Sequence, residues 1–576
     1  MEDDLSRKPA VWLRAAACLT AAGLVVAGCA KKENTSTPNG GNQPAEESVG
    51  YPETADLPSS PGKAGGTFRL GLTEPTALDP YNSQESEGSL ITHELFTQLA
   101  KVDPAGKTTP SLAEKWSTND NCSEWTFNLK KGTKFHNGEE VTSASFKRGW
   151  ERAAVKSAAS DVAYHMDQIE GYDALSGGTA TTFSGVDASD PAVLKVKLAQ
   201  PSCEFYIRTT HTVFSPVPSV AGAADNAAFN LAPIGNGPFM MDGVWQHDKG
   251  IKLKRFDGYT AGPKANLDAV EITITGAESG SQEEYDGFNN GSFDWARMPV
   301  PVLATARAAN DPKKQWISKK TSGINYLLPM VTQKPLDTPK ARKAISLAID
   351  RKAIAEGVFQ KSQVPATAFV PAGFKDAYQP DVCDVCKYDP EQAKKLAAEA
   401  GLTAGTELKF QFNAGSGHEE WTAAVKQQIE KTLGLKVTYG GVPFKDMLVN
   451  EQASGASGIF RAAWGADYAT PGNFLQPLLS TASIGTTDPS KPVVGDNRGR
   501  WSNKQFDDLL TKAASTKDEA ERNKVYKQAE KIAIGDELAL IPMFARQQFR
   551  LANTAKFGNV NIDFFENPSL SEITLK

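Results

Sequence analysis

The chain has 576 residues, a formal net charge of -6 and a pI near 5.8. Domains that bind nucleic acid are usually basic, so this charge argues against a nucleic-acid partner. The residues after position 64 are more than one hydrophobic core usually organises, so we expect two or three domains.

The N-terminus has the layout of an export signal. Arg7, Lys8 and Arg14 precede the apolar run 15–27, which ends in front of Cys29. A positively charged start, a short apolar run and small residues before a cleavage point are typical of a signal peptide. The run is shorter than the roughly 20 residues needed to cross a bilayer, so we expect residues 1–28 to be removed.

The boundary at Cys29 resembles the bacterial lipobox. That resemblance implies cleavage before Cys29, a diacylglycerol on its thiol, and a mature chain held on the extracytoplasmic face of the cell membrane. Residues 29–64 are rich in Asn, Thr, Pro, Gly, Ser and Glu, and such a composition predicts a flexible linker. The alternative is ordinary secretory cleavage beside an incidental cysteine.

The first part of the body shows alternating strands and one capped helix. Strands are expected at 66–72, 124–135, 192–201 and 250–256, because apolar and polar residues alternate there. Thr142 can cap a helix over 143–154.

The later part adds helices that begin at a proline. Thr338 followed by Pro339 predicts a helix that carries 340–359, since proline at the first helical position loses no needed hydrogen bond. Asp389 and Pro390 repeat the pattern before a helix that Gly401 can end. Strands at 408–412 and 435–441 flank an amphipathic helix over 419–434. The predicted fold class is therefore mixed α/β.

Four cysteines remain if Cys18 is removed with the signal and Cys29 is lipidated. An even number in an exported chain is compatible with two disulfides, and four cysteines allow three connectivities. Half a zinc site or a redox motif is an alternative for the CxxC pair, but no second pair or nearby histidine completes a metal site. We favour the pairs Cys383 with Cys386 and Cys122 with Cys203.

Motifs of catalysis are missing from the sequence. It has no Walker loop and no Gly-x-Ser-x-Gly elbow, and its six histidines lack metal-ligand spacing. We therefore expect no enzyme activity, no cofactor and no metal.

Several stretches, in order, resemble one family. The family is the extracytoplasmic solute-binding proteins of peptide-type ABC transporters, family 5, which includes oligopeptide- and dipeptide-binding lipoproteins. The matching stretches are LDPYNS (78–83), HELFTQLAKVD (93–103), PSLAEKWS (110–117), WTFNLKKGTKFHNGEEVTS (125–143), IGNGPFMM (234–241), ARKAISLAIDR (341–351), YDPEQAKKLAAEAG (388–401) and AAWGADYATPGNFL (462–475).

The resemblance implies a periplasmic-binding-protein-like clamp of type II, in the large three-domain class, with mixed sheets. Ligand would lie between two lobes that close about hinge strands near residues 323 and 545. Lobe I would comprise 65–102, 215–323 and 545–576, with 103–214 as a satellite domain on it, and lobe II would comprise 324–544.

The stretch RAAWGADY, 461–468, suggests the ligand class. By resemblance to oligopeptide-binding relatives, Asp467 takes the α-ammonium of the ligand, Arg461 meets its carboxylate, and Trp464 forms an aromatic wall. Phe444 would form a second wall and Tyr468 would adjoin the site. Gly465 stands where the relative has a cysteine, which would widen the pocket. The backbone of Gly465, and of Gln84, Glu85 and Ser86 on the other lobe, would pair with the peptide main chain as an added strand.

Each of these residues also has a simpler interpretation. Trp464 could be a core aromatic, Asp467 could cap the turn before Pro471, and Arg461 could be solvated.

The favoured function is a monomeric, lipid-anchored receptor that delivers oligopeptides to the permease subunits of an ABC transporter in the membrane. One alternative is the same clamp binding a nickel complex, haem or an oligosaccharide. Another is a secreted hydrolase, which should show a nucleophile and base or a metal cluster.

Overall fold

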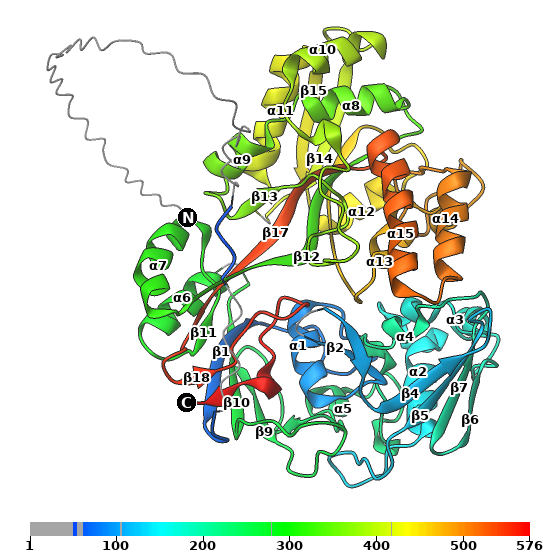
Figure 1. Ribbon diagram of the computed structural model, residues 1–576, viewed down its shortest axis with the longest axis vertical. Coiled ribbons are helices and arrows are strands. Elements are labelled where there is room, and N and C mark those ends of the chain that lie inside the picture. The colour runs from blue at the N-terminus through cyan, green and yellow to red at the C-terminus, as the bar shows by residue number, and fades with distance from the viewer. Residues whose placement is uncertain (1–49, 55–61, 104–105, 278, 416) are drawn as a thin grey trace, which may run out of the picture. The chain divides into compact units, whose positions relative to one another are not determined.

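The computed structural model describes residues 50–54, 62–103, 106–277, 279–415 and 417–576. These residues belong to one compact unit, Val49–Lys576. The predicted signal peptide, Cys29 and most of the predicted linker lie outside the described residues. The described chain is mixed α/β, as predicted (Figure 1). No helix in this described part combines the length and apolar character that a membrane span requires.

The largest sheet among the described residues has 11 strands and two halves. Strand β13 (Gln363–Pro365) pairs with β17 (Ile541–Ala552) and lies beside the main path, which is the row of neighbouring hydrogen-bonded strands. The order along that path is β15 (Lys436–Val442), β14 (Glu407–Asn413), β16 (Ile459–Gly465), β12 (Trp316–Pro329), β17 (Ile541–Ala552), β11 (Trp295–Ala296), β1 (Thr67–Thr73), β10 (Ala269–Thr275), β9 (Gly250–Arg255) and β8 (Phe239–Met241).

Two long antiparallel strands, β12 and β17, join these halves and run side by side through the middle of Figure 1. Their register shifts between Lys320 and Ile324, and Ile324 then pairs with Ala545. A register shift disrupts the ladder locally and increases its twist. The irregularity coincides with the predicted hinge positions, while the hinge motion itself stays a prediction.

A separate four-stranded sheet lies within the segment predicted as the satellite domain. Its order is β4 (Ala113–Thr118), β5 (Glu124–Leu129), β7 (Val193–Lys197) and β6 (Val186–Asp190). Helix α2 (Ser143–Ala154) has the predicted bounds and packs Phe146 and Trp150 into the core of this segment. The strand predicted over 124–135 is too long, because the chain turns after Leu129 and Gly132 has a φ of +73°.

The prediction of one helix that carries 340–359 is wrong in one respect. The segment forms two helices, α8 (Pro339–Leu347) and α9 (Arg351–Gly357). The side chain of Asp350 accepts a hydrogen bond from the Ala353 N–H at 2.9 Å, so it caps a new helix at this point. Helix α10 (Pro390–Glu399) starts at its predicted proline, and Gly401 follows it with a φ of +76°.

The remaining helices and strands lie around these two sheets or connect their strands. They are α1 (Ser86–Leu95), β2 (Ala100–Val102), β3 (Thr108–Pro110), α3 (Tyr172–Gly177), α4 (Phe205–Arg208), α5 (Ala227–Leu231), α6 (Gly280–Asn289), α7 (Leu303–Asn310), α11 (Glu419–Leu433), α12 (Phe444–Gln452), α13 (Gly472–Leu479), α14 (Lys504–Ala514), α15 (Glu519–Glu530), β18 (Phe557–Gly558) and β19 (Thr574–Leu575).

Three hydrophobic clusters follow the predicted segments closely. One draws on 65–102, 217–317 and 552–573, a second on 99–214 with Tyr259 and Ala261, and a third on 324–544 with Phe564. The division into lobes stays a prediction, because a hydrophobic cluster shared by several segments does not by itself show that these segments move as one lobe. The structure contains the disulfides Cys122–Cys203 and Cys383–Cys386, the two pairs that the sequence analysis favours.

The cap at Asp350 can be tested directly. Asp350→Ala removes an N-cap acceptor, which costs about 1 kcal/mol and corresponds to roughly fivefold faster local opening. We expect amide hydrogen exchange in α9 to accelerate by that factor, and Asp350→Asn, which keeps an acceptor, to remain close to wild type. Unchanged exchange in the alanine variant would show that the cap does not separate the two helices.

Candidate ligand-binding site

Strand β16 carries the central part of the predicted site. It pairs antiparallel with β12 along its whole length and parallel with β14 only at Ile459 and Phe460, so the backbone from Arg461 to Gly465 is paired on the β12 side. Arg461, Trp464 and Gly465 lie on this strand, and Asp467 and Tyr468 lie in the loop 466–471 before α13. Five of the predicted residues are therefore brought together by one strand and its following loop.

The carboxylate of Asp467 is held by a buried amide. The Nδ2 of Asn473 donates to Oδ2 of Asp467 at 3.0 Å, and the Asp467 N–H donates to Oδ1 of Asn473 at 2.9 Å. Burial raises the pKa of Asp467 to about 6, opposed by the Asn473 hydrogen bond. Asp496 raises this pKa further and Arg208 lowers it. The group is thus mostly ionised at neutral pH and receptive to a cation.

Residues of the segment 103–214 approach the same loop, which the sequence analysis did not anticipate. The guanidinium of Arg208 lies 5.4 Å from the centroid of the Tyr468 ring, and the His165 ring lies 6.0 Å from it. Arg208 also donates to Oδ1 of Asp167 at 2.8 Å. Tyr468 is buried and contacts these side chains. Its place beside the ligand stays a prediction.

The other end of β16 is cationic. Arg461 donates from Nη2 to Oδ1 of Asn325 at 2.8 Å and from Nη1 to Oδ1 of Asn413 at 3.3 Å. Its buried Nε has no hydrogen-bond partner, and no acidic residue of the described chain forms an ion pair with it. Burial and the neighbouring Arg546 lower the pKa of Arg461 to about 10. A half-buried guanidinium held by neutral amides favours an anionic ligand group.

Arg546 occupies space that two glycines leave open. Gly465 pairs with Gly323 across β16 and β12. A β-carbon on Gly323 would lie 2.2 Å from Cδ of Arg546, whereas one on Gly465 would lie 3.7 Å from its Nη1. The small residue at 465, expected to widen the pocket, thus faces a guanidinium. Arg546 was missed because it follows Gly465 by 81 residues in sequence.

The aromatic predictions find little support in the contacts. Trp464 and Arg461 are three residues apart on one strand, so their side chains leave opposite faces. Trp464 is half-buried against the cluster of 324–544, and its Nε1 has no hydrogen-bond partner in the described chain. Phe444 is 55% exposed at the start of α12, and no ring contact among the described residues joins it to Trp464.

The predicted segment on the other lobe forms the start of α1. The Oε1 atom of Glu85 accepts from the N–H groups of Thr76 at 2.7 Å and Gly88 at 3.1 Å, so this side chain caps the helix. Ser86 is the first helical residue. A helical backbone offers no strand edge, so pairing with a ligand strand is restricted to Gln84 and Glu85. No hydrogen bond in the described chain joins them to β16.

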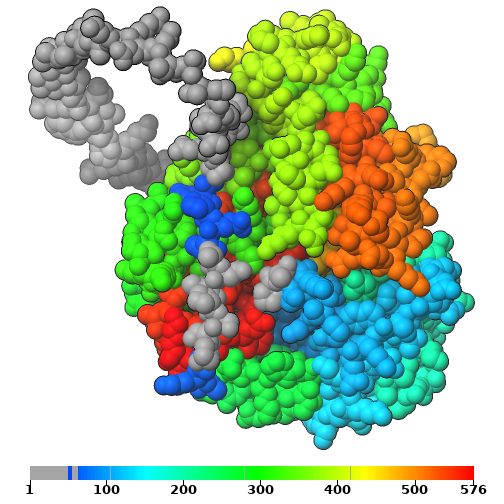
Figure 2. Space-filling view, in the orientation of Figure 1, coloured from blue at the N-terminus to red at the C-terminus, as the bar shows by residue number. Residues whose placement is uncertain are grey.

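A cavity of about 870 Å³ lies beside the loop that carries Asp467. Ala469, Thr470 and Pro471 line it from the loop, and Glu204 and Ile207 line it from the segment 103–214. Asp467 does not line this cavity. Figure 2 shows the orange surface of α14 and α15 close to the cyan surface of the segment 103–214.

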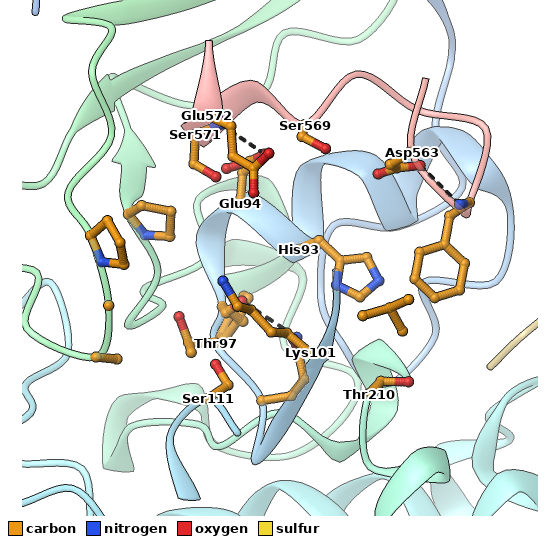
Figure 3. Close-up of a pocket in the computed structure, with 18 of the residues that line it drawn as sticks. His93, Glu94, Thr97, Lys101, Ser111, Thr210, Asp563, Ser569, Ser571 and Glu572 are labelled. Carbon is orange, nitrogen blue, oxygen red and sulfur yellow. Dashed lines mark hydrogen bonds between the residues drawn. The ribbon is translucent and has the colours of Figure 1, made fainter. Parts of the chain in front are cut away.

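A second pocket, of about 290 Å³, lies between α1 and the C-terminal segment (Figure 3). Burial raises the pKa of Glu94 to about 8 and that of Asp563 to about 7, and lowers that of His93 to about 4. None of the predicted site residues lines it. No group of three or more His, Cys, Asp or Glu in the described chain is placed to hold a metal ion.

Comparison with known proteins places this arrangement in a family. The profile of "Bacterial extracellular solute-binding proteins, family 5 Middle" matches residues 107–486. The chain is 27% identical over 485 residues to the "Oligopeptide-binding protein OppA" of Bacillus subtilis, covering 82% of this chain and 86% of that one.

Two further proteins are similar. The "Probable deoxycholate-binding periplasmic protein YgiS" of Escherichia coli is 28% identical over 489 residues, with coverage of 83% and 88%. The solved structure of the Escherichia coli murein tripeptide-binding protein MppA superimposes with a TM-score of 0.69 at 24% identity, covering 90% of this chain and 99% of that chain. This structural similarity shows the periplasmic-binding-protein fold.

The chain belongs to the bacterial extracellular solute-binding proteins, family 5. Its members are non-enzymatic binding proteins, so the expectation of no enzyme activity is confirmed. The family prediction is confirmed as well.

The glycine pair provides a structural test. Gly323→Ala would push its methyl group into the Arg546 side chain, and such overpacking costs about 1–3 kcal/mol. Gly465→Ala makes an ordinary contact and should change stability by less than about 0.5 kcal/mol. We expect thermal unfolding to show a lower midpoint only for Gly323→Ala, and Arg546→Ala to restore it in the double variant. Equal midpoints for both alanine variants would contradict this packing.

Proposed function

We propose that this protein captures oligopeptides between two lobes and delivers them to an ABC permease. One observation carries the proposal, namely that a single strand and its following loop present opposite charges, each held by neutral amides. Asp467 is held by Asn473 at one end, and Arg461 is held by Asn325 and Asn413 at the other. A peptide zwitterion has the complementary charges at its two ends.

The spacing suits a short extended peptide. Four residue steps separate Arg461 from Gly465 in β16, which is roughly 13 Å at about 3.3 Å per residue, and Asp467 follows two residues later in the loop. An extended chain of about four or five residues covers a similar distance. A ligand ammonium shielded beside Asp467 would form a charge-assisted hydrogen bond, and a ligand that contacts both lobes stabilises their closed arrangement.

The names of the relatives support a peptide as the ligand, and one of them also suggests a different ligand class. OppA of Bacillus subtilis is an oligopeptide-binding protein, whereas YgiS bears the name of a deoxycholate binder. Deoxycholate, neutral sugars and haem have no ammonium to pair with Asp467. A requirement for a free amine therefore separates peptides from these ligands and from nickel complexes.

The decisive experiment is calorimetry on protein stripped of ligand by partial unfolding and refolding. We expect pools of tri- to pentapeptides to bind with free N-termini and to lose at least 30-fold in affinity when acetylated. Loss of one partner of a buried charge pair costs about 2–5 kcal/mol, so Asp467→Asn should cause a similar loss. Asp446→Asn, at an exposed carboxylate on α12, is the matched control and should bind like wild type. Equal binding of free and acetylated peptides would reject the ammonium site.

Peptide affinity should also depend on pH in a defined direction. The pKa of Asp467 is raised to about 6, and binding of an ammonium requires the ionised form. Affinity should therefore be constant above pH 7 until the peptide amine deprotonates near pH 8, and should fall about tenfold per unit as pH drops below 6. Titrations from pH 4.5 to 7.5 measure this. The Asp467→Asn variant should lack the acidic limb, and an acidic limb in that variant would assign it to another group.

We further propose that the mature protein is a monomer anchored by a lipid on Cys29. The linker expected over 29–64 is rich in Asn, Thr, Pro, Gly, Ser and Glu, a composition typical of a flexible tether. Its described part is an exception to that expectation, because the Thr54 N–H donates to the Ser318 carbonyl at 2.9 Å and the Tyr51 ring packs against Trp316. Cys29→Ser should move the protein from the membrane fraction to the soluble fraction, and mass spectrometry of the wild-type N-terminus should show a diacylglycerol. Membrane retention of the serine variant would refute the anchor.

A further inference from the structure

A buried carboxylate connects the segment 103–214 to the loop that carries Asp467. The Thr470 hydroxyl donates to Oε1 of Glu204, and the Tyr526 hydroxyl donates to its Oε2 at 2.5 Å. The Nε of Arg522 lies 2.9 Å from Oε1 of Glu204. All four side chains are buried. Glu204 therefore joins three positions of 324–544, one of which lies in the Asp467 loop.

The backbone of the loop is fitted closely to this cluster. A β-carbon on Gly472 would lie 2.6 Å from the Tyr526 hydroxyl oxygen and 3.0 Å from Oε2 of Glu204. Thr470 and Asn473 lie on either side of Gly472, and Asn473 holds the Asp467 carboxylate. The turn at Gly472 therefore connects the Glu204 contacts to the hydrogen bonds around Asp467.

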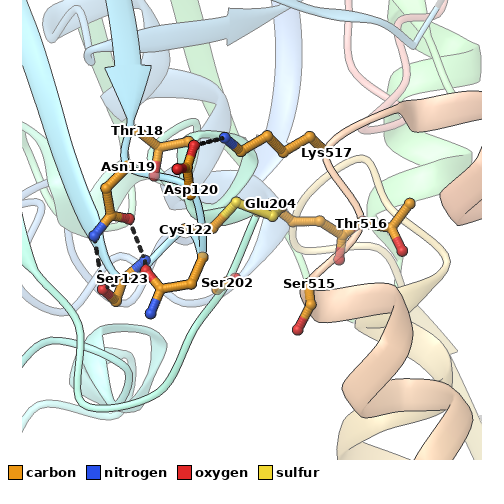
Figure 4. The surroundings of a disulfide bond; sticks show 12 residues. Thr118, Asn119, Asp120, Cys122, Ser123, Ser202, Glu204, Ser515, Thr516 and Lys517 are labelled. Carbon is orange, nitrogen blue, oxygen red and sulfur yellow. Dashed lines mark hydrogen bonds and ion pairs between the residues drawn. A yellow bond between two sulfur atoms is a disulfide. The ribbon is translucent and has the colours of Figure 1, made fainter.

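The residue before Glu204 is held both by a disulfide within its own segment and by a hydrogen bond to α14 (Figure 4). Cys203, the preceding residue, forms the disulfide with Cys122, and its N–H donates to the carbonyl of Ala514 at 2.7 Å. Asp120 lies 3.6 Å from Nζ of Lys517 across the same boundary. The disulfide therefore holds Glu204 where α14 and α15 meet the segment 103–214.

We propose that Glu204 is a positioning residue for ligand binding: it holds Thr470, and through the turn at Gly472 it holds Asp467 ready for the ligand amine. This inference rests on the proposed peptide function. Glu204 and its three partners come from segments predicted to belong to different parts of the clamp. In the structure these contacts join the two parts directly, and separating the parts would leave Glu204 and Arg522 without their partners.

The test compares affinities for one pentapeptide in its free and acetylated forms. Glu204→Gln and Thr470→Val should each weaken binding of the free peptide at least tenfold and reduce the ratio of free to acetylated affinity. Thr470→Ser keeps the hydroxyl and should restore both to within threefold of wild type. Asp79→Asn is the control. Asp79 is also a buried carboxylate, and its Oδ1 lies 2.6 Å from Nη1 of Arg152, which is not part of the loop 466–471. The control variant should lower the unfolding temperature and leave the affinity ratio unchanged. A folded Glu204→Gln protein with the wild-type ratio overturns the inference while the peptide function stands.

Hydrogen exchange of the ligand-free protein tests the coupling without peptide. Glu204→Gln should accelerate amide exchange at least fivefold in 467–473, and Asp79→Asn should leave that segment unchanged. Unchanged exchange in Glu204→Gln would overturn the coupling. A wild-type protein that binds no peptide would overturn the proposed function and the role of Asp467, and the exchange result would then report only on the contact.

Discussion

The structure depends on the pairing of two long antiparallel strands, β12 and β17, which both halves of the large sheet share. Every other strand of that sheet is placed relative to this pair. Strand β16 lies directly against β12, so the candidate ligand site is built on the neighbour of a predicted hinge strand. The register shift near Ile324 lies level with Trp464, and Gly323 there faces Gly465. A change in the twist of β12 and β17 at this point would therefore move the backbone of β16, which carries the candidate site.

Charges near the site are held in two different ways. Asp467 and Arg461 are held by amides, which orient a charge without neutralising it. Glu204 is instead paired with the Arg522 guanidinium and accepts from two hydroxyl groups. A buried charge without an ion-pair partner favours the binding of a ligand group of opposite charge. A buried charge that is already paired contributes instead to specific contact between segments of the chain. The same physical rule thus separates groups suited to a ligand from groups suited to joining parts of the chain.

Much of the fold could be predicted from local sequence patterns. The bounds of α2 and the start of α10 follow from a helical pattern behind Thr142 and Pro390, and the α/β class follows from alternating strands and helices. The break at Asp350 was missed because apolar residues continue at helical spacing across it, and only the cap hydrogen bond reveals the new start. The length of the strand from Glu124 was overestimated for a related reason, since alternation continues past Gly132 into a turn.

The candidate site was predictable only where its residues are contiguous. Arg461 to Tyr468 form one stretch, so a family resemblance could identify them together. Arg546 and Glu204 reach the site through tertiary packing, and nothing in their local sequence indicates it. Asn473 lies six residues after Asp467, within the matching stretch 462–475, but its role shows only in its hydrogen bonds. The opposite-face placement of Trp464 does follow from strand periodicity, and it weakens the predicted aromatic wall.

The central claim is that a ligand ammonium pairs with Asp467, and proton linkage tests it most directly. At pH 6 the unliganded carboxyl, with a pKa of about 6, is about half protonated, and a bound ammonium would lower that pKa. Calorimetry at pH 6 in buffers of different ionisation enthalpy should therefore show release of about half a proton per peptide bound, and no release in Asp467→Asn. Binding without proton release, or with equal release in the variant, would contradict the account.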